Sequence, residues 1–345
     1  MAIRVAINGF GRIGRLFFRQ ALQNKNFTVV AINDLGDLEN LAYLLQHDSV
    51  YGTLGEEVRI EEGRTEEWGR LDVGGKTTDV FRVADAAQLP WKKMEIDVVV
   101  ESTGVFESYE KAQVHLKAGA KHVVISAPAK DEDGSDSKTV LMGVNEKDLQ
   151  GCRLSSNGSC TTNSIASVIQ VLHEHVGVQK AVLNTTHAYT ATQSIVDGPV
   201  RGGKDFRRGR AAGQNIVPSS TGAAIAVARV IPDMKDKFDG IALRVPVVAG
   251  SIADVTFLAA RKTSVEEINE VLEKAAKSPK LKNILQVTRE QLVSSDIIGQ
   301  PYGALVDLNF TRVVDGDLVK VLSWYDNEWG YVATLVRHVE ETAKA

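Results

Sequence analysis

Residues 9–14 read Gly9-Phe10-Gly11-Arg12-Ile13-Gly14 and directly follow an apolar run at residues 3–7. The apolar run predicts a buried strand, and apolar residues at helical spacing predict a helix over residues 12–23. A glycine-rich turn between strand and helix lets the backbone approach a ligand, and the helix N-terminus favours negative charge. A second predicted strand, residues 29–33, is followed by Asp34, twenty residues after Gly14. This order is typical of a dinucleotide-binding βαβ unit.

The same stretch predicts which dinucleotide is bound. Gly9, Gly11 and Gly14 would let the backbone approach a pyrophosphate, and the Asp34 carboxylate would accept hydrogen bonds from the adenosine ribose. A 2′-phosphate would meet like charge at Asp34, which favours NAD over NADP. Arg12 and Ile13 are expected at the pyrophosphate. The alternatives are a glycine-rich turn without a ligand and, for Arg12, a solvated charge in the first helical turn.

Strand-like and helix-like segments continue to alternate through the first half of the chain. Apolar runs at residues 97–101 and 122–125 predict buried strands, with helices at residues 37–45 and 108–118. Such βα alternation predicts a doubly wound parallel sheet of the Rossmann type. Thr103 and Ser126 follow two of these strands, where ligands of open α/β sheets bind, and are expected to contact the cofactor. Plain strand-ending turns are the alternative for both.

The second half of the chain has a different pattern. Residues 161–175 predict a helix, residues 180–187 predict a long strand, and residues 188–218 form an irregular stretch. The later strand-like segments indicate a mostly antiparallel sheet with helices on one face; they are residues 241–245, 253–260, 304–307 and 318–324. The pattern places a domain border near residues 150–160, so we predict an NAD-binding domain over residues 1–158, and residues 326–345 are predicted to contain a final helix. An α+β catalytic domain is predicted over residues 159–325.

Composition limits the possible functions. The chain has 345 residues, 43% of them hydrophobic and 24% charged, as in an ordinary globular protein. A net charge of -4 argues against nucleic acid as the main partner of the whole surface. Two cysteines are too few for a disulfide framework, and the first residues lack a signal-peptide pattern, so a cytoplasmic protein without a membrane partner is expected. The seven histidines show no metal-binding spacing, and no metal is expected.

One cysteine has the surroundings of a nucleophile. Ser159-Cys160-Thr161-Thr162-Asn163 places Cys160 among small polar residues at a predicted helix start, which favours the thiolate. His187 ends a predicted strand and is the best candidate for the accompanying base. The structural alternatives are a small hydrophobic residue at a helix start and a histidine satisfied at a strand end.

Several cations point to an anionic substrate. Residues 201–210 carry five cations against one carboxylate, which fits a solvated loop, a phosphate site or a contact to nucleic acid. Thr221 and Gly222 precede an Ala-rich helix whose N-terminus suits an anion. Arg244 ends an apolar strand, where an unpaired charge is costly. With a thiolate and a dinucleotide site, these residues indicate oxidation of a phosphorylated aldehyde.

These motifs, taken together along nearly the whole chain, closely resemble the glyceraldehyde-3-phosphate dehydrogenase family. The matching stretches are Ile7-Asn8-Gly9-Phe10-Gly11-Arg12-Ile13-Gly14-Arg15, Ser159-Cys160-Thr161-Thr162-Asn163, His187-Ala188-Tyr189-Thr190, Ser220-Thr221-Gly222-Ala223-Ala224, Leu243-Arg244-Val245-Pro246 and Trp324-Tyr325-Asp326-Asn327-Glu328. The resemblance implies a glycolytic and gluconeogenic enzyme. Its expected substrates are glyceraldehyde 3-phosphate, inorganic phosphate and NAD.

The resemblance also implies a mechanism. Cys160 would attack the aldehyde to give a thiohemiacetal, while His187 acts as general base and the Cys160 backbone N–H holds the oxyanion. Hydride transfer to NAD would leave a thioester, which inorganic phosphate releases as 1,3-bisphosphoglycerate. Alternatives are erythrose-4-phosphate dehydrogenase, which releases its acid by water, and a non-enzymatic role in RNA binding.

By the same resemblance, further residues receive expected contacts. Thr190 and Arg244 would bind the phosphate of the substrate. Arg208 and Arg210 of the basic run are also expected to contact phosphate. The attacking phosphate would meet Ser159, Thr161, Thr221 and Gly222. Asn327 would hold the nicotinamide carboxamide, with Tyr331 close by. The long loop after His187 implies a homotetramer, and the C-terminal helix within residues 326–345 would complete the NAD-binding domain.

Overall fold

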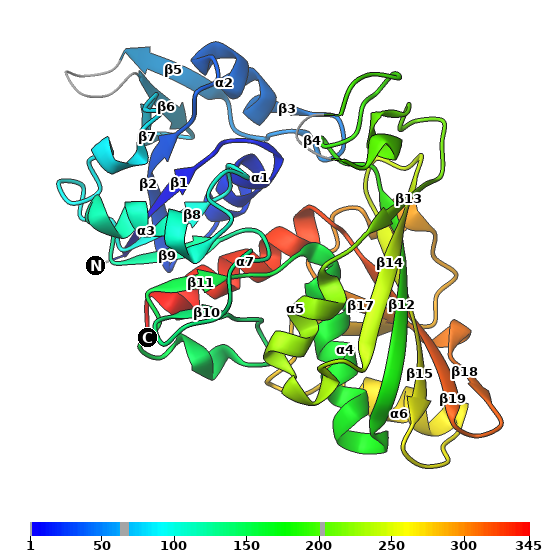
Figure 1. Ribbon diagram of the computed structural model, residues 1–345. Coiled ribbons are helices and arrows are strands. Elements are labelled where there is room, and N and C mark those ends of the chain that lie inside the picture. Colours follow the sequence, from blue (N-terminus) through cyan, green and yellow to red (C-terminus); the bar gives the residue numbers. More distant parts are fainter. Residues whose placement is uncertain (1, 63–68, 201–203) are drawn as a thin grey trace. The chain divides into compact units, whose positions relative to one another are not determined.

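The structure, a computed structural model, describes residues 2–62, 69–200 and 204–345. The chain forms two compact units (Figure 1). The first comprises Met1–Val140, Asn145–Gly158 and Leu335–Ala345, and the second comprises Leu141–Val144 and Ser159–Thr334. Within the described ranges, no helix combines the length and apolar character that crossing a bilayer requires.

The first unit is built on a nine-stranded sheet with the order β10-β11-β9-β8-β1-β2-β7-β6-β5 among the described residues. The strands are β1 (Ile3–Asn8), β2 (Phe27–Asn33), β5 (Val58–Glu62), β6 (Gly69–Val73), β7 (Lys76–Phe81), β8 (Val98–Glu101), β9 (His122–Ile125), β10 (Ser137–Thr139) and β11 (Leu154–Ser156). Pairing is parallel from β10 to β7, which confirms the predicted doubly wound parallel sheet.

Antiparallel strands β6 and β5 extend this sheet beyond the predicted parallel part. A Gly74-Gly75 turn with φ of 59° and 80° joins β6 to β7, and this two-residue glycine turn is the sequence signal for the hairpin. A separate ribbon pairs β3 (His47–Asp48) with β4 (Gly52–Thr53).

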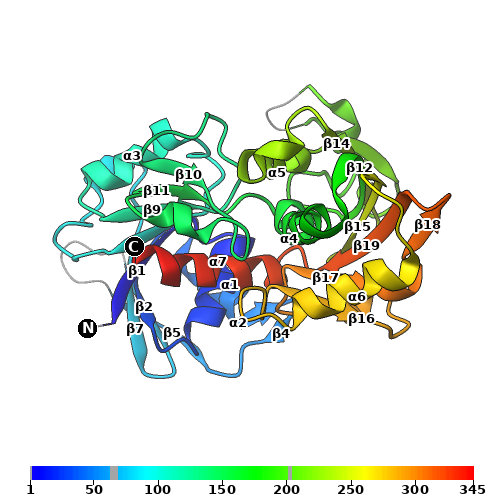
Figure 2. The same ribbon diagram turned by 90° about the horizontal axis from the view of Figure 1, so that it is seen from below.

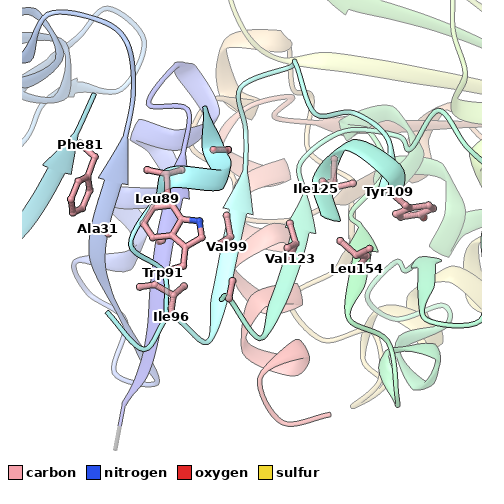
Figure 3. Close-up of a cluster of buried hydrophobic side chains, with 14 of the residues drawn as sticks. Ala31, Phe81, Leu89, Trp91, Ile96, Val99, Tyr109, Val123, Ile125 and Leu154 are labelled. Atoms are coloured by element: carbon pink, nitrogen blue, oxygen red, sulfur yellow. The ribbon is translucent and has the colours of Figure 1, made fainter. Parts of the chain in front are cut away.

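Helices cover both faces of the first sheet. They are α1 (Arg12–Ala21), α2 (Leu38–Gln46) and α3 (Tyr109–Lys117). Figure 3 shows the apolar cluster that includes Trp91, Val99 and Val123, together with Tyr109 of α3. Ile7 faces α1 on the opposite side, because a Cβ at Gly14 of that helix would lie 3.2 Å from its Cγ2. Burial on both faces explains the nearly continuous apolar runs of these strands.

The turn between β1 and α1 requires glycine at two positions. Gly9 has φ of +95°, and a Cβ there would lie 2.6 Å from the backbone nitrogen of Thr103. A Cβ at Gly14 would lie 2.1 Å from the Gly9 carbonyl oxygen. These glycines therefore bring β1, α1 and the end of β8 close together.

The C-terminal helix α7 (Trp329–Thr342) contributes a buried histidine to the first unit. His338 is fully buried, with Nδ1 3.0 Å from Asn157 Oδ1 and Nε2 2.8 Å from Ser155 Oγ. Burial lowers the pKa of His338 from its ordinary 6.5 to about 3. The histidine is therefore neutral in the folded protein at neutral pH.

This depressed pKa predicts a loss of stability in acid. Between pH 6.5 and about 3 the unfolded chain binds a proton at His338 that the folded chain does not. The contribution of the neutral His338 to the free energy of unfolding is therefore complete above pH 6.5 and is lost as the pH is lowered towards 3. In urea unfolding between pH 4 and 7, His338→Gln should reduce the pH slope by up to about 1.4 kcal/mol per pH unit. The variant His47→Gln, which removes an exposed histidine, provides the control for the loss of an imidazole. An unchanged slope in His338→Gln would contradict the prediction.

The second unit contains an eight-stranded sheet among the described residues, with the order β13-β14-β12-β15-β19-β17-β16 and β18 beside β19. The strands are β12 (Val178–Ala188), β13 (Val217–Ser220), β14 (Phe238–Val245), β15 (Ser251–Ala259), β16 (Leu285–Thr288), β17 (Ala304–Asp307), β18 (Arg312–Val314) and β19 (Leu318–Tyr325). Only β12–β14 and β16–β17 pair in parallel among these described strands, which confirms the predicted mostly antiparallel sheet.

Helix α4 (Cys160–Val176) packs against this sheet, and α5 (Ala223–Val230) and α6 (Val265–Ala276) pack beside it (Figure 2). The short 3-10 helices are η1 (Ala86–Gln88), η2 (Glu146–Leu149), η3 (Phe206–Gly209), η4 (Pro232–Met234), η5 (Ser294–Ile297) and η6 (Leu308–Phe310). Between β12 and β13, residues 189–200 and 204–216 are largely irregular, as the lack of periodicity predicted.

Candidate functional site

Cys160 is the first residue of α4, at the positive end of the helix dipole. Ser159 caps this helix: its Oγ accepts the Thr162 N–H at 3.0 Å, and the Thr162 hydroxyl in turn accepts the Ser159 N–H at 3.3 Å. This reciprocal capping box fixes the backbone around Cys160. The serine and threonine neighbours that made the sequence conspicuous thus hold the helix start in place.

Strand pairing brings His187 and Arg244 to the cysteine. The two residues are direct partners in the parallel pair β12–β14. His187 Nε2 lies 3.3 Å from Cys160 Sγ, and Arg244 Nη1 lies 2.6 Å from His187 Nδ1. Three residues singled out from distant parts of the sequence therefore form one contiguous cluster in the second unit.

The electrostatics of this cluster correct the expectation of a thiolate. Burial raises the pKa of Cys160, although the Arg244 charge and hydrogen bonds from Thr161 act in the opposite direction. Burial and then the Arg244 charge lower the pKa of His187 to about 3. Without ligand, the pair is therefore a neutral thiol and a neutral imidazole. The sequence around Cys160 shows its polar neighbours, but the burial that shifts these pKa values comes from strands that are distant in the chain.

Tyr325, at the end of β19, is part of the cluster although sequence reasoning gave it no role. Its hydroxyl lies 2.8 Å from both Thr161 Oγ1 and Thr185 Oγ1, and its ring centroid is 5.9 Å from that of His187. The Thr161 hydroxyl, expected to meet a phosphate, is thus bonded inside the protein. Tyr325 lies on the buried side of β19, a position that its alternating pattern could have indicated.

Arg208 and Arg210 of the basic run have different partners in the structure. Arg208 Nη2 donates to Ser219 Oγ at 2.8 Å, and its charge contributes, after burial, to the lowered pKa of Arg244. Arg210 instead pairs with Asp197 at 2.8 Å. Among the described arginines of this run, Arg208 is therefore the one that lies near the cluster. Residues 201–203 lie outside the described part of the chain.

The remaining expected phosphate contacts lie at element ends in the second unit. Thr190 follows β12, and its hydroxyl lies 2.9 Å from that of Thr192. The Thr221 hydroxyl accepts the Ala223 N–H at 3.2 Å, and Gly222 is the N-cap of α5 without a side-chain cap. Both threonines are partly exposed, so their hydroxyls can reach solvent.

Expected cofactor contacts of the first unit gather at the carboxyl ends of β1, β2, β8 and β9. A Cβ at Gly11 would meet no atom within 4 Å, so the backbone there is open to a ligand. The Asp34 oxygens accept N–H bonds from Phe10 at 2.6 Å and Gly36 at 2.7 Å, and each retains a lone pair. Exposed Thr103 and partly exposed Ser126 follow β8 and β9. These residues fit a bound dinucleotide.

The side chain of Arg12, expected at the pyrophosphate, forms an ion pair within the protein. Its Nη1 lies 2.6 Å from Asp48 Oδ2, and its guanidinium lies 5.8 Å from the centroid of the Tyr51 ring. Burial alone would raise the pKa of Asp48, but the N–H groups of Val50 and Tyr51 and the Arg12 charge lower it overall. The side chain is thus held by an ion pair, and Ile13 follows it in the first turn of α1.

Asn327 and Tyr331 belong to the second unit. Ser251 Oγ donates to Asn327 Oδ1 at 2.9 Å and accepts the Ala188 N–H at 3.1 Å. Ser251, which sequence reasoning missed, therefore orients the Asn327 amide relative to the end of β12. Tyr331 is buried in α7, with 4% of its surface exposed. The described residues contain no group of three or more His, Cys, Asp or Glu side chains suited to a metal ion.

Comparison with known proteins agrees with this arrangement. Residues 3–109 match the family model "Glyceraldehyde 3-phosphate dehydrogenase, NAD binding domain", and residues 159–327 match "Glyceraldehyde 3-phosphate dehydrogenase, C-terminal domain". The chain is 47% identical over 345 residues to a glyceraldehyde-3-phosphate dehydrogenase of Clostridium pasteurianum, covering 99% of this chain and 98% of the relative. It is 47% identical over 339 residues to that of Streptomyces coelicolor, covering 97% of each. The chain therefore belongs to the glyceraldehyde-3-phosphate dehydrogenase family.

Proposed function

We propose that this protein catalyses the NAD-dependent, phosphorylating oxidation of glyceraldehyde 3-phosphate to 1,3-bisphosphoglycerate in glycolysis and gluconeogenesis. The observation that carries this function is the cluster in which His187 Nε2 lies 3.3 Å from Cys160 Sγ, with Arg244 beside the imidazole. It combines a nucleophile, a base and an anion-binding cation. The family membership supports the same reaction.

Cys160 is the proposed nucleophile and acyl carrier. As its sulfur bonds to the aldehyde carbon, the thiol proton passes to His187 Nε2, and His187 then returns it to the former carbonyl oxygen, which gives the thiohemiacetal. His187 then takes the hydroxyl proton when the thiohemiacetal is oxidised to a thioester. The backbone N–H of Cys160, at the start of α4, stabilises the oxyanion.

Two groups of residues are proposed for the two phosphates. Arg244, Arg208 and Thr190 would bind the phosphate of the substrate, since two neighbouring guanidinium groups suit a dianion. The attacking phosphate would meet Ser159, Thr161, Thr221 and Gly222. Arg210 has less support as a phosphate ligand, because it is exposed and paired with Asp197.

The first unit would hold NAD, which accepts the hydride when bound. The backbone at Gly9, Gly11 and Gly14 and the N-terminus of α1 suit its pyrophosphate, with Arg12 and Ile13 contributing their main chain. Asp34 would accept ribose hydroxyls, and Thr103 and Ser126 would line the same edge. Asn327 and Tyr331 are proposed as contacts to the nicotinamide.

The deciding experiment is NADH formation from glyceraldehyde 3-phosphate with and without inorganic phosphate or arsenate. A strong dependence on either anion is expected, because the thioester is released by the anion. A rate that phosphate does not stimulate would reject this function and favour erythrose-4-phosphate dehydrogenase chemistry, in which water releases the acid.

Replacement of Asp34 tests the proposed cofactor choice. Asp34→Asn keeps one acceptor oxygen, which can serve one of the two N–H groups of Phe10 and Gly36, and removes the charge that repels a 2′-phosphate. We expect kcat/KM for NADP relative to NAD to rise by about tenfold or more, the effect of one charged contact. Steady-state rates with each cofactor measure this ratio, with exposed Asp37→Asn as the control. An unchanged ratio would exclude Asp34 from the ribose site.

A homotetramer in the cytoplasm is proposed as the working form. Ile195, Val196 and Phe206, in the stretch between β12 and β13, are 87%, 72% and 78% exposed. Val182 and Ile241, on neighbouring strands of the second sheet, are 63% and 54% exposed. Exposed apolar side chains of this size are often covered by another subunit, which supports the proposed assembly. Both cysteines are free, as expected in a reducing compartment.

A further inference from the structure

Two neighbours of His187 Nδ1 require different protonation states of this nitrogen. The Ala188 carbonyl oxygen lies 2.7 Å from Nδ1, and Arg244 Nη1 lies 2.6 Å from the same nitrogen. A carbonyl oxygen only accepts, so the first contact is a hydrogen bond only when Nδ1 carries a proton. A guanidinium only donates, so the second requires a lone pair on Nδ1. The nitrogen satisfies one neighbour at a time.

The state of Nδ1 decides what Nε2 presents to Cys160 Sγ, 3.3 Å away. A neutral imidazole carries one proton. When Arg244 donates to Nδ1, that proton is on Nε2, which points an N–H at the sulfur and has no lone pair for a proton. When Nδ1–H donates to Ala188, the Nε2 lone pair faces the thiol. Arg244 at Nδ1 also opposes the imidazolium, in which both nitrogens carry protons.

Arg244 has other partners available. The same Nη1 lies 3.2 Å from the Ala188 oxygen, so the guanidinium can donate there without Nδ1. Burial lowers the pKa of Arg244, Cys160 and Tyr325 act in the opposite direction, and the nearby Arg208 charge lowers it further. A dianionic phosphate supplies a compensating negative charge and accepts two N–H bonds from one guanidinium.

We propose that Arg244 is a positioning residue that sets the tautomer of His187, and that the substrate's phosphate, by drawing the guanidinium off Nδ1, creates the catalytic base. This inference rests on the proposed function for the identity of the phosphate-bearing substrate. The net charge of the imidazole does not change: Nε2 loses one proton to solvent and Nδ1 gains one from it. Recognition of the phosphate is thereby coupled to the chemistry at Cys160, and a substrate without phosphate loses kcat as well as affinity.

The tautomer can be observed by 15N NMR of the full-length protein with labelled histidine imidazoles. The probe is sn-glycerol 3-phosphate, which carries a phosphate but no aldehyde, and His187→Asn assigns the resonances. We expect a protonated Nε2 without ligand and a protonated Nδ1 with it. One hydrogen bond from a charged donor corresponds to a change of about tenfold to hundredfold in the tautomer ratio. A protonated Nδ1 in the ligand-free protein would overturn the proposal.

Two variants separate the tautomer from general charge effects. Arg244→Met removes the donor, so the ligand-free protein should already have its proton on Nδ1. Arg208→Met removes a nearby charge that does not contact Nδ1, and should leave the ligand-free tautomer unchanged. Unchanged resonances of the other six histidines show that each variant is folded. If Arg244→Met does not fold, the wild-type spectra with and without sn-glycerol 3-phosphate decide alone.

A kinetic test distinguishes the proposed gating from simple phosphate binding. D-glyceraldehyde carries no phosphate, so a pure binding role for Arg244 predicts equal kcat in wild type and Arg244→Met, with NAD and arsenate present. Gating predicts a kcat about tenfold higher in Arg244→Met, and stimulation by added phosphite in wild type only. Equal or slower turnover by the variant would overturn the proposal. Failure of the proposed function is a separate result: wild type would then not form NADH from glyceraldehyde 3-phosphate and phosphate.

Discussion

Replacing Cys160 by serine is expected to lower kcat by roughly 10⁴-fold or more, because a serine hydroxyl does not ionise near neutral pH and forms no thioester. The substitution changes one atom at the start of α4 and leaves the capping box of Ser159 and Thr162 in place. Stability should therefore change little while turnover is lost. Steady-state NADH formation and thermal unfolding together measure the two effects.

Cys152 provides the matched control. Its thiol is buried, donates to the Leu154 carbonyl oxygen at 3.0 Å, and has a pKa that burial raises to about 11. Cys152→Ser should keep kcat within a few-fold of wild type. Iodoacetamide should label Cys160 faster than Cys152, because Cys160 is partly exposed and Cys152 is buried. Equal labelling rates, or a Cys160→Ser variant with near wild-type turnover, would contradict the assignment of the nucleophile.

Replacing His187 by asparagine should lower kcat by about 10²- to 10⁴-fold, the usual contribution of a general base. Nε2 lies 3.3 Å from Cys160 Sγ, so the variant loses the group that accepts the thiol and hydroxyl protons. The effect should appear in kcat more than in KM, because Arg244 and Arg208 remain to bind the phosphate. Rates measured over a range of substrate concentrations separate the two constants.

A histidine on the same helix as the nucleophile serves as the control for this variant. His173 is at the surface of α4, with Nε2 3.3 Å from Asp233 Oδ2. His173→Asn should leave kcat unchanged. If His187→Asn retained wild-type kcat, proton transfer would have to be assigned to another group.

Much of the first unit could be predicted from the sequence because its signals are local. Strands buried on both faces give continuous apolar runs, and the turn at Gly9 and Gly14 admits no side chain. The antiparallel strands β5 and β6 were not predicted, although residues 58–61 alternate apolar and charged residues as an edge strand does, because neither this alternation nor the Gly74-Gly75 signal was used. Ser251 and Tyr325 were missed because their partners lie far away in the chain.

The sequence alone determined the family, the doubly wound sheet, the mostly antiparallel second sheet and NAD as the cofactor, since these depend on residue spacing and motif order. The tertiary structure alone decided the state of the nucleophile. Local neighbours predicted a thiolate at Cys160, but the folded chain raises the pKa of this partly exposed thiol by burial and brings His187 and Arg244 to it from two paired strands. Burial and charge act through space, and the order of residues along the chain does not specify distances between them.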